Sequence, residues 1–170
     1  MTDRQAERGE ASIEADPEVP IIRITRDFAG TPAQLQRAHT DPEVFARWIG
    51  PDGTDVRIVE WDARDGGAWH WVSTLHGEEY AFRGCFHQVA PHRIVQTFTY
   101  LGMPDDVALE TLWFEELAAG RTRLHAQSLV DSFEGRDAWL ASGMEVGVNE
   151  GYAKLDGLLR GGVVEAWPDD

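Results

Sequence analysis

The strongest constraint in this sequence is a long stretch in which apolar and polar residues alternate with a period of two. It runs from Thr54 to Val130 and is interrupted by short segments rich in Gly, Pro, Asp and His. Such alternation places one set of side chains on each face of a strand, and tight turns join neighbouring strands antiparallel. We predict about six strands joined as a meander, over residues 56–61, 68–74, 80–89, 93–101, 107–117 and 121–130.

Helical signals flank this stretch on both sides. A β-branched strand over 20–28 is followed by Thr31-Pro32 and then by Asp41-Pro42, and each pair is typical of an N-cap followed by a first-turn proline. We therefore predict two short helices, over 33–39 and 43–48, between the first and second strands.

After the meander, apolar residues recur three and four apart along 136–160, which predicts one long helix that ends at Gly161-Gly162. The order of elements predicts an α+β fold in which one curved sheet covers one long helix. The residues of the apolar helix face are Leu140, Met144, Val148, Leu155 and Leu158.

Charge narrows the classes of partner. The chain has 170 residues, with 15 Lys and Arg against 30 Asp and Glu, and a net charge of −15. A protein that binds nucleic acids or anionic membrane surfaces needs clustered Lys and Arg side chains, so we exclude both kinds of partner. No apolar run approaches the ~18 residues of a membrane span. The single cysteine, Cys85, cannot form an intrachain disulfide, and this indicates a reducing, cytoplasmic location.

The ends of the chain differ from its body. Residues 1–19 hold six acids and little that is large and apolar, so we predict a disordered acidic tail. Residues 20–162 form the predicted folded domain, and 163–170 a C-terminal tail.

Familiar catalytic motifs are missing from the sequence. It has no Gly-x-Ser-x-Gly and no dinucleotide- or phosphate-binding glycine pattern, so we predict no cofactor. Cys85 and His87 alternate onto one strand face, with His92 after the next turn, but zinc sites use tighter paired spacings and four ligands. We therefore predict no metal site.

Four polar residues lie singly within apolar strands. In the ordinary interpretation they occupy the exposed face of the sheet. In the alternative, some point inward, where a histidine could act as acid or base and a buried Arg83 would need a carboxylate such as Glu110. The candidate catalytic residues are His70, Arg83, Glu110 and His125.

Glycines and aromatic residues indicate a hollow interior. Gly143, Gly147 and Gly151 recur four residues apart, and each glycine inside a helix costs ~1 kcal/mol relative to alanine. They serve either close approach of helix and sheet or space for a ligand. The residues expected to bind such a ligand are Trp69, Trp71, Phe82, Phe98, Tyr100, Trp113, Met144, Gly147, Val148 and Gly151.

Several segments together carry a family resemblance. They are Thr31-Pro32-Ala33, Asp41-Pro42-Glu43, Trp48-Ile49-Gly50-Pro51, Asp65-Gly66-Gly67, Phe82-Arg83-Gly84 and residues 90–98, 110–116, 120–124 and 142–152. Over 20–160 the sequence resembles the START-like (SRPBCC) superfamily. Within it, the sequence is similar to the Aha-type domains, homologues of the activator of the heat-shock protein 90 ATPase, and to a bacterial polyketide-cyclase-like branch. The resemblance implies a helix-grip fold, in which a curved antiparallel sheet wraps around a long C-terminal helix. It implies no universal catalytic motif.

Three functional hypotheses follow. The first is a module that binds a hydrophobic small molecule, lipid-like or polyketide-like, between sheet and helix. The second is a cyclase-like or hydrolase-like enzyme that uses inward polar groups. The third is a chaperone-partner or stress-related interaction protein, steered to a basic partner by its acidic surface. A homodimer is compatible with all three.

Overall fold

One antiparallel sheet of eight strands, in the order β1-β2-β8-β7-β6-β5-β4-β3, forms the framework of the computed structural model, which describes residues 9–168. The six strands predicted for the meander are present, and consecutive ones pair antiparallel, with register shifts between Ile58 and Glu60 and between Phe86 and Gln88. The strands are β1 (Ser12–Ala15), β2 (Ile21–Phe28), β3 (Asp55–Trp61), β4 (Ala68–Leu75), β5 (Glu78–Ala90), β6 (Arg93–Tyr100), β7 (Ala108–Glu116) and β8 (Thr122–Leu129).

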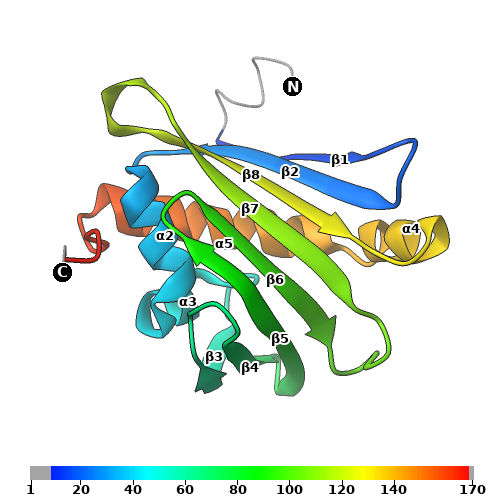
Figure 1. The fold of residues 1–170 in the computed structure, drawn as a ribbon. Helices are drawn as coiled ribbons and strands as arrows, with labels where there is room; N and C mark the ends of the chain where they lie inside the picture. The colour runs from blue at the N-terminus through cyan, green and yellow to red at the C-terminus, as the bar shows by residue number, and fades with distance from the viewer. Residues whose placement is uncertain (1–8, 169–170) are drawn as a thin grey trace.

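The helices lie on one side of this sheet. The longest, α5 (Met144–Arg160), runs across one face, and α2 (Pro32–Thr40) and α3 (Pro42–Trp48) cover the end of the same face (Figure 1). A further helix, α4 (Phe133–Ala141), precedes α5, and the 3-10 turn η1 (Ala118–Gly120) joins β7 to β8. The predicted α+β helix-grip fold is confirmed. No helix of residues 9–168 is long and apolar enough to cross a membrane.

Local sequence explains where the short helices begin. The Thr31 hydroxyl accepts a hydrogen bond from the Gln34 backbone N–H, and the Gln34 side chain accepts one from the Thr31 N–H, which completes a capping box. The Asp41 side chain likewise accepts from the Glu43 N–H at the start of α3. Asp41 is both the C-cap of α2 and the N-cap of α3, so one helix follows the other directly, and α3 lies beside α5.

The prediction of one long helix over residues 136–160 is wrong at one point, because the chain forms two helices, α4 and α5, there. Gly143 has a φ of +88°, in the left-handed region, and it separates α4 from α5. A residue in that conformation cannot continue a right-handed helix, and glycine adopts it without a steric penalty. The apolar spacing continues across the break, so periodicity alone did not reveal it.

The predicted acidic tail differs from the structure over residues 9–19. Ser12–Ala15 form β1, which pairs antiparallel with β2, and Ala11 and Ser12 are buried. The Ala11 N–H donates to Asn149 Oδ1 of α5 at 2.9 Å. An edge strand is ordered by its hydrogen bonds to the neighbouring strand, so β1 forms although its sequence is polar. The predicted disorder of residues 1–8 lies outside the described residues.

The C-terminal segment is also docked, as far as residue 168. Val164 is fully buried and its carbonyl accepts a hydrogen bond from Gln34 Nε2 at 2.8 Å. The Trp167 indole donates to Thr40 Oγ1 at 3.0 Å and packs against the Arg37 guanidinium. The described part of the predicted tail over 163–170 therefore packs against α2, while residues 169–170 are not described.

The close packing of β4 and β6 around Gly84 of β5 generates a stability prediction. A Cβ added at Gly84 would overlap the Thr97 carbonyl oxygen and lie 2.5 Å from the Trp69 ring. Gly84→Ala should therefore lower the free energy of unfolding by about 3 kcal/mol, measured by urea denaturation. The matched control is Gly157→Ala in α5, where a Cβ meets nothing within 4 Å, and it should raise stability by up to about 1 kcal/mol. Equal effects of the two substitutions would contradict this account.

Candidate ligand-binding cavity

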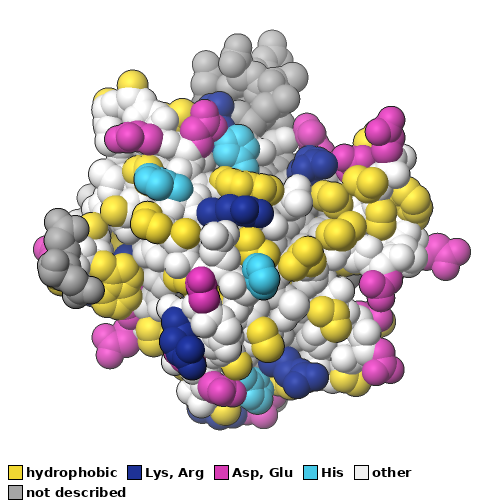
Figure 2. Space-filling view, viewed as in Figure 1, with side chains coloured by type: hydrophobic (Ala, Val, Ile, Leu, Met, Phe, Trp, Pro, Cys, Tyr) yellow, Lys and Arg dark blue, Asp and Glu magenta, His cyan; other side chains and the backbone are white. Residues whose placement is uncertain are grey.

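A cavity of about 300 Å³ lies between the inner face of the sheet and α5. Strands β2 to β8 form its floor, the first half of α5 forms its roof, and α2 and α3 close one end. Because β-strand side chains alternate, only every second residue of each strand reaches it. The same alternation leaves charged, histidine and apolar side chains mixed on the opposite face, which Figure 2 shows.

Aromatic side chains line one wall. Trp71 and Phe82 stack at a centroid distance of 4.4 Å, and Trp69 contacts Phe98 at 5.7 Å. Trp139 of α4 stacks on Phe98 at 5.9 Å. These rings come from three adjacent strands and one helix, and each supports the next. The rings therefore form one continuous aromatic wall.

The three glycines of the predicted stripe have three different surroundings. A Cβ at Gly151 would lie 3.0 Å from the Trp48 carbonyl oxygen, so this glycine permits close approach of α5 to α3. A Cβ at Gly147 would meet only Pro51, at 3.6 Å, and Gly147 lines the cavity. Gly143 precedes the helix and does not line the cavity. Both interpretations of the stripe thus apply: Gly147 leaves space for the cavity, and Gly151 permits close approach while it also lines the cavity.

A row of polar side chains crosses the otherwise apolar floor. Gln96, Glu110 and Ser128 lie directly opposite one another on β6, β7 and β8. Gln96 Nε2 donates to Glu110 Oε1 at 3.1 Å, and Ser128 Oγ donates to Glu110 Oε2 at 2.9 Å. Burial raises the pKa of the Glu110 carboxyl, although both hydrogen bonds act in the opposite direction.

A buried histidine closes the end formed by α2. His39 Nδ1 lies 2.7 Å from the Leu35 carbonyl oxygen, so Nδ1 carries the proton that it donates and Nε2 is an acceptor. The ring packs against Trp48 at 5.0 Å and Phe114 at 5.4 Å. Burial lowers the pKa of His39 to about 4, so the imidazole is neutral at neutral pH.

The structure places eight of the ten predicted ligand-binding residues in the lining: Trp69, Trp71, Phe82, Phe98, Met144, Gly147, Val148 and Gly151. Trp113 is not among them, because its neighbour Leu112 takes the inward position on β7, and Trp113 lies near Arg93 on the outer face. Tyr100 ends β6, beyond the cavity, and is 37% exposed.

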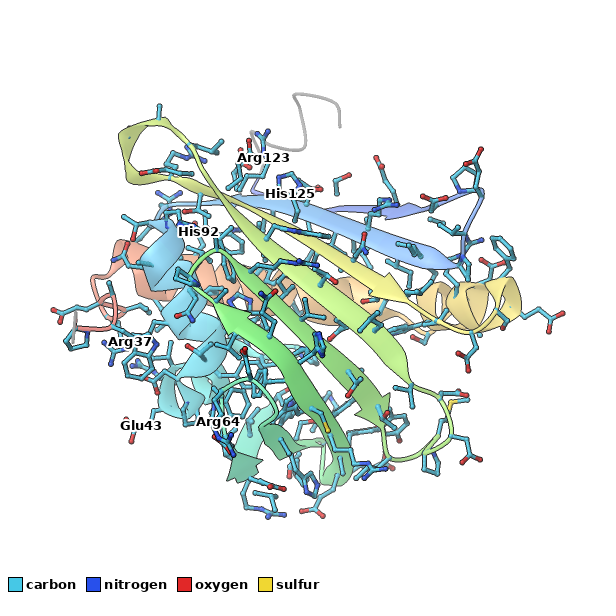
Figure 3. All side chains as sticks on the ribbon, in the orientation of Figure 1. Arg37, Glu43, Arg64, His92, Arg123 and His125 are labelled. Atoms are coloured by element: carbon cyan, nitrogen blue, oxygen red, sulfur yellow. The ribbon has the colours of Figure 1, made fainter. Side chains whose placement is uncertain are left out.

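The four candidate catalytic residues separate. Glu110 lines the cavity, whereas His70, Arg83 and His125 do not. His70 and Arg83 pair across β4 and β5 on the outer face, so the predicted contact of Arg83 with Glu110 does not form. His125 lies on that face, away from α5 (Figure 3), where its Nε2 is 2.6 Å from Glu115 Oε2. Strand alternation shows which residues share a face but not which face is inner.

Sequence reasoning missed four polar or ionisable groups of the lining: His39, Gln96, Ser128 and Tyr152. One of them left a signal, because His39 follows Leu35 by four residues in a helix whose inward side those residues mark. Within residues 9–168 no three His, Cys, Asp or Glu side chains are grouped to hold a metal ion. Cys85 is exposed.

The family model described as activator of Hsp90 ATPase homolog 1-like protein matches residues 29–160. The chain belongs to this family. The matched range includes most of the cavity, from α2 to the end of α5. The resemblance predicted from the sequence is confirmed.

Solved structures share the fold of this family member. A protein from Rhodobacter sphaeroides is 28% identical, with a TM-score of 0.80 over 89% of this chain and 99% of that one. A protein from Mycobacterium smegmatis is 24% identical, with a TM-score of 0.79 over 87% and 95%. DynU16, from the dynemicin biosynthetic locus, is 19% identical, with a TM-score of 0.62 over 84% of this chain and 48% of its own. No curated protein matches the sequence.

The buried histidine predicts a pH-dependent stability. Its pKa in the folded state, about 4, lies below the ordinary value of 6.5, so the unfolded state takes up this proton first as the pH falls. The stability that neutral His39 confers is thus lost between pH 6.5 and about 4. His39→Asn keeps a donor near the Leu35 carbonyl but does not titrate. The free energy of unfolding of the native chain minus that of the variant should fall by about 3 kcal/mol over this range. A difference that does not change with pH would refute the assignment.

Proposed function

We propose that this protein binds a hydrophobic small molecule in the cavity between the sheet and α5. The observation that carries the proposal is the aromatic wall of Trp69, Trp71, Phe82 and Phe98 around about 300 Å³ of space. This volume is at the lower end of the range for small-molecule sites. The walls are preformed, so little binding energy would be spent on ordering them.

The cost in folding stability of leaving the cavity empty supports the proposal. Space of this size beneath an apolar wall costs on the order of several kcal/mol of stability, because the lining loses contacts that a packed core would make. Larger side chains at Gly147 and Ala126, which both line the cavity, would fill part of it. A ligand would restore the missing contacts.

The shape of the wall favours one class of ligand. The wall is built from flat indole and phenyl rings, which complement flat ring systems better than a flexible acyl chain. A polyketide-like or other fused-ring molecule therefore suits the cavity better than a lipid chain. The polar row of Gln96, Glu110 and Ser128 would orient it.

A cyclase-like or hydrolase-like activity is the second candidate, and one observation favours it. The cavity contains a carboxyl whose pKa is raised and an imidazole whose pKa is lowered, which is a pattern of acid–base sites. His39 packs on Phe114, four residues beyond Glu110 on the same face of β7. If a bound molecule is recovered chemically unchanged after incubation, the enzymatic candidate is ruled out and only the binding function remains.

The roof residue Gly147 provides the test of the binding function. Gly147→Leu would place a bulky side chain at a roof position that lines the cavity, beside Pro51, so binding of the neutral probe naphthalenemethanol should be abolished while the fold is kept. Gly157→Leu is the matched control, because it adds the same side chain to the exposed face of the same helix. Backbone amide chemical shifts in a ligand titration measure both affinity and location, and circular dichroism checks the fold. Undiminished binding by a folded Gly147→Leu variant would overturn the proposal.

A further inference from the structure

Only one side chain of the cavity lining within the described residues can carry a charge at neutral pH. Its lining, within residues 9–168, contains no lysine or arginine, and Glu110 is its only Asp or Glu. Its other ionisable groups are His39 of α2 and Tyr152 of α5. Burial lowers the pKa of His39 and raises that of Tyr152, so both are uncharged at neutral pH. Glu110 alone can bring a charge to the cavity.

The hydrogen bonds of Glu110 suit the ionised form. The Gln96 amide and the Ser128 hydroxyl each donate to a different carboxyl oxygen, so two protein donors hold the group as an acceptor. A carboxylate oxygen accepts more than one hydrogen bond, and further acceptor capacity therefore remains. Buried carboxylates are normally paired with a cation. Among the described residues, Glu110 forms no ion pair with a Lys, Arg or His side chain.

The aromatic wall has the same preference. The faces of Trp69, Trp71, Phe82 and Phe98 carry the negative side of the ring quadrupole, which attracts cations and repels anions. A lone carboxylate beside such faces is the combination that recognises alkylammonium groups. The overall charge of −15 would also concentrate organic cations around the protein.

We infer that the ligand of this cavity is a hydrophobic organic cation, a flat ring system with a protonated amine that pairs with Glu110 while its rings lie against the Trp69, Trp71, Phe82 and Phe98 wall. This inference rests on the proposed function and names its ligand class. The ligand supplies the positive charge that the cavity lacks. An aromatic acid of the same shape would bring its carboxylate beside Glu110 and be rejected.

A matched set of three probes tests the inference. Naphthylmethylamine, naphthalenemethanol and naphthoic acid share one ring system and differ in carrying a cation, a neutral hydroxyl or an anion at neutral pH. In amide chemical-shift titrations the amine should bind at least tenfold more tightly than the alcohol, and the acid should not bind. Glu110→Gln keeps the size of the residue, and its amide can still bond to both neighbours if the Ser128 hydroxyl accepts where it had donated. It should lower affinity for the amine at least tenfold and remove most of the amine's advantage over the alcohol.

Controls separate the inference from the function beneath it. Glu115→Gln removes a carboxylate from the same strand but from its outer face, so it should leave all three affinities unchanged. Equal binding of amine and alcohol by the native chain overturns the inference and leaves the proposed function intact, and this comparison needs no variant. Absence of binding by all three probes overturns both.

Discussion

The cavity depends on how α5 is anchored to the sheet. The buried residues of α5 begin at its middle, with Gly151 and Tyr152, and continue through its second half, where Leu155 and Leu159 are enclosed by the core. Tyr152 contacts Phe28. Asp156 fixes the same half, because it accepts a hydrogen bond from the Ala29 N–H at 2.9 Å and from Arg160 Nε at 2.7 Å. The first half, with Met144, Gly147 and Val148, remains only partly buried and spans the hollow as a roof. One end of a single helix thus stabilises the fold, and the other creates the site.

The close contact of α5 with α3 sets the width of that hollow. Gly151 allows the Trp48 carbonyl to approach the helix, and the Trp48 indole donates to the Ala38 carbonyl of α2. The Trp61 indole donates to the Thr40 carbonyl at the end of the same helix. Tryptophans from α3 and β3 therefore hold α2 in place, and with it the His39 ring. The packing that closes one end of the cavity also positions a functional group there.

Sequence patterns predicted the fold more fully than the site. The meander, both short helices and the final helix followed from local signals, namely alternation, caps and apolar spacing, because those signals are short-range. The face of the sheet that becomes the interior is set by tertiary packing, so Trp113 and Glu110 could not be assigned from the sequence. Gly143 has the same four-residue spacing as Gly147 and Gly151, yet it separates α4 from α5. The order of β1 comes from β2, which a composition argument on residues 1–19 does not include.

The electrostatics of the cavity follow from burial acting on different kinds of group. Burial disfavours whichever form is charged, so it lowers the pKa of His39 and raises the pKa values of Glu110 and Tyr152. At neutral pH His39 and Tyr152 are therefore uncharged, because the shifts move both pKa values away from neutrality. Glu110 is different, because two hydrogen bonds support its ionised form against the same effect. The polar row across β6, β7 and β8 is therefore the part of the cavity whose charge a ligand can alter, and the surrounding rings determine which ligands do so.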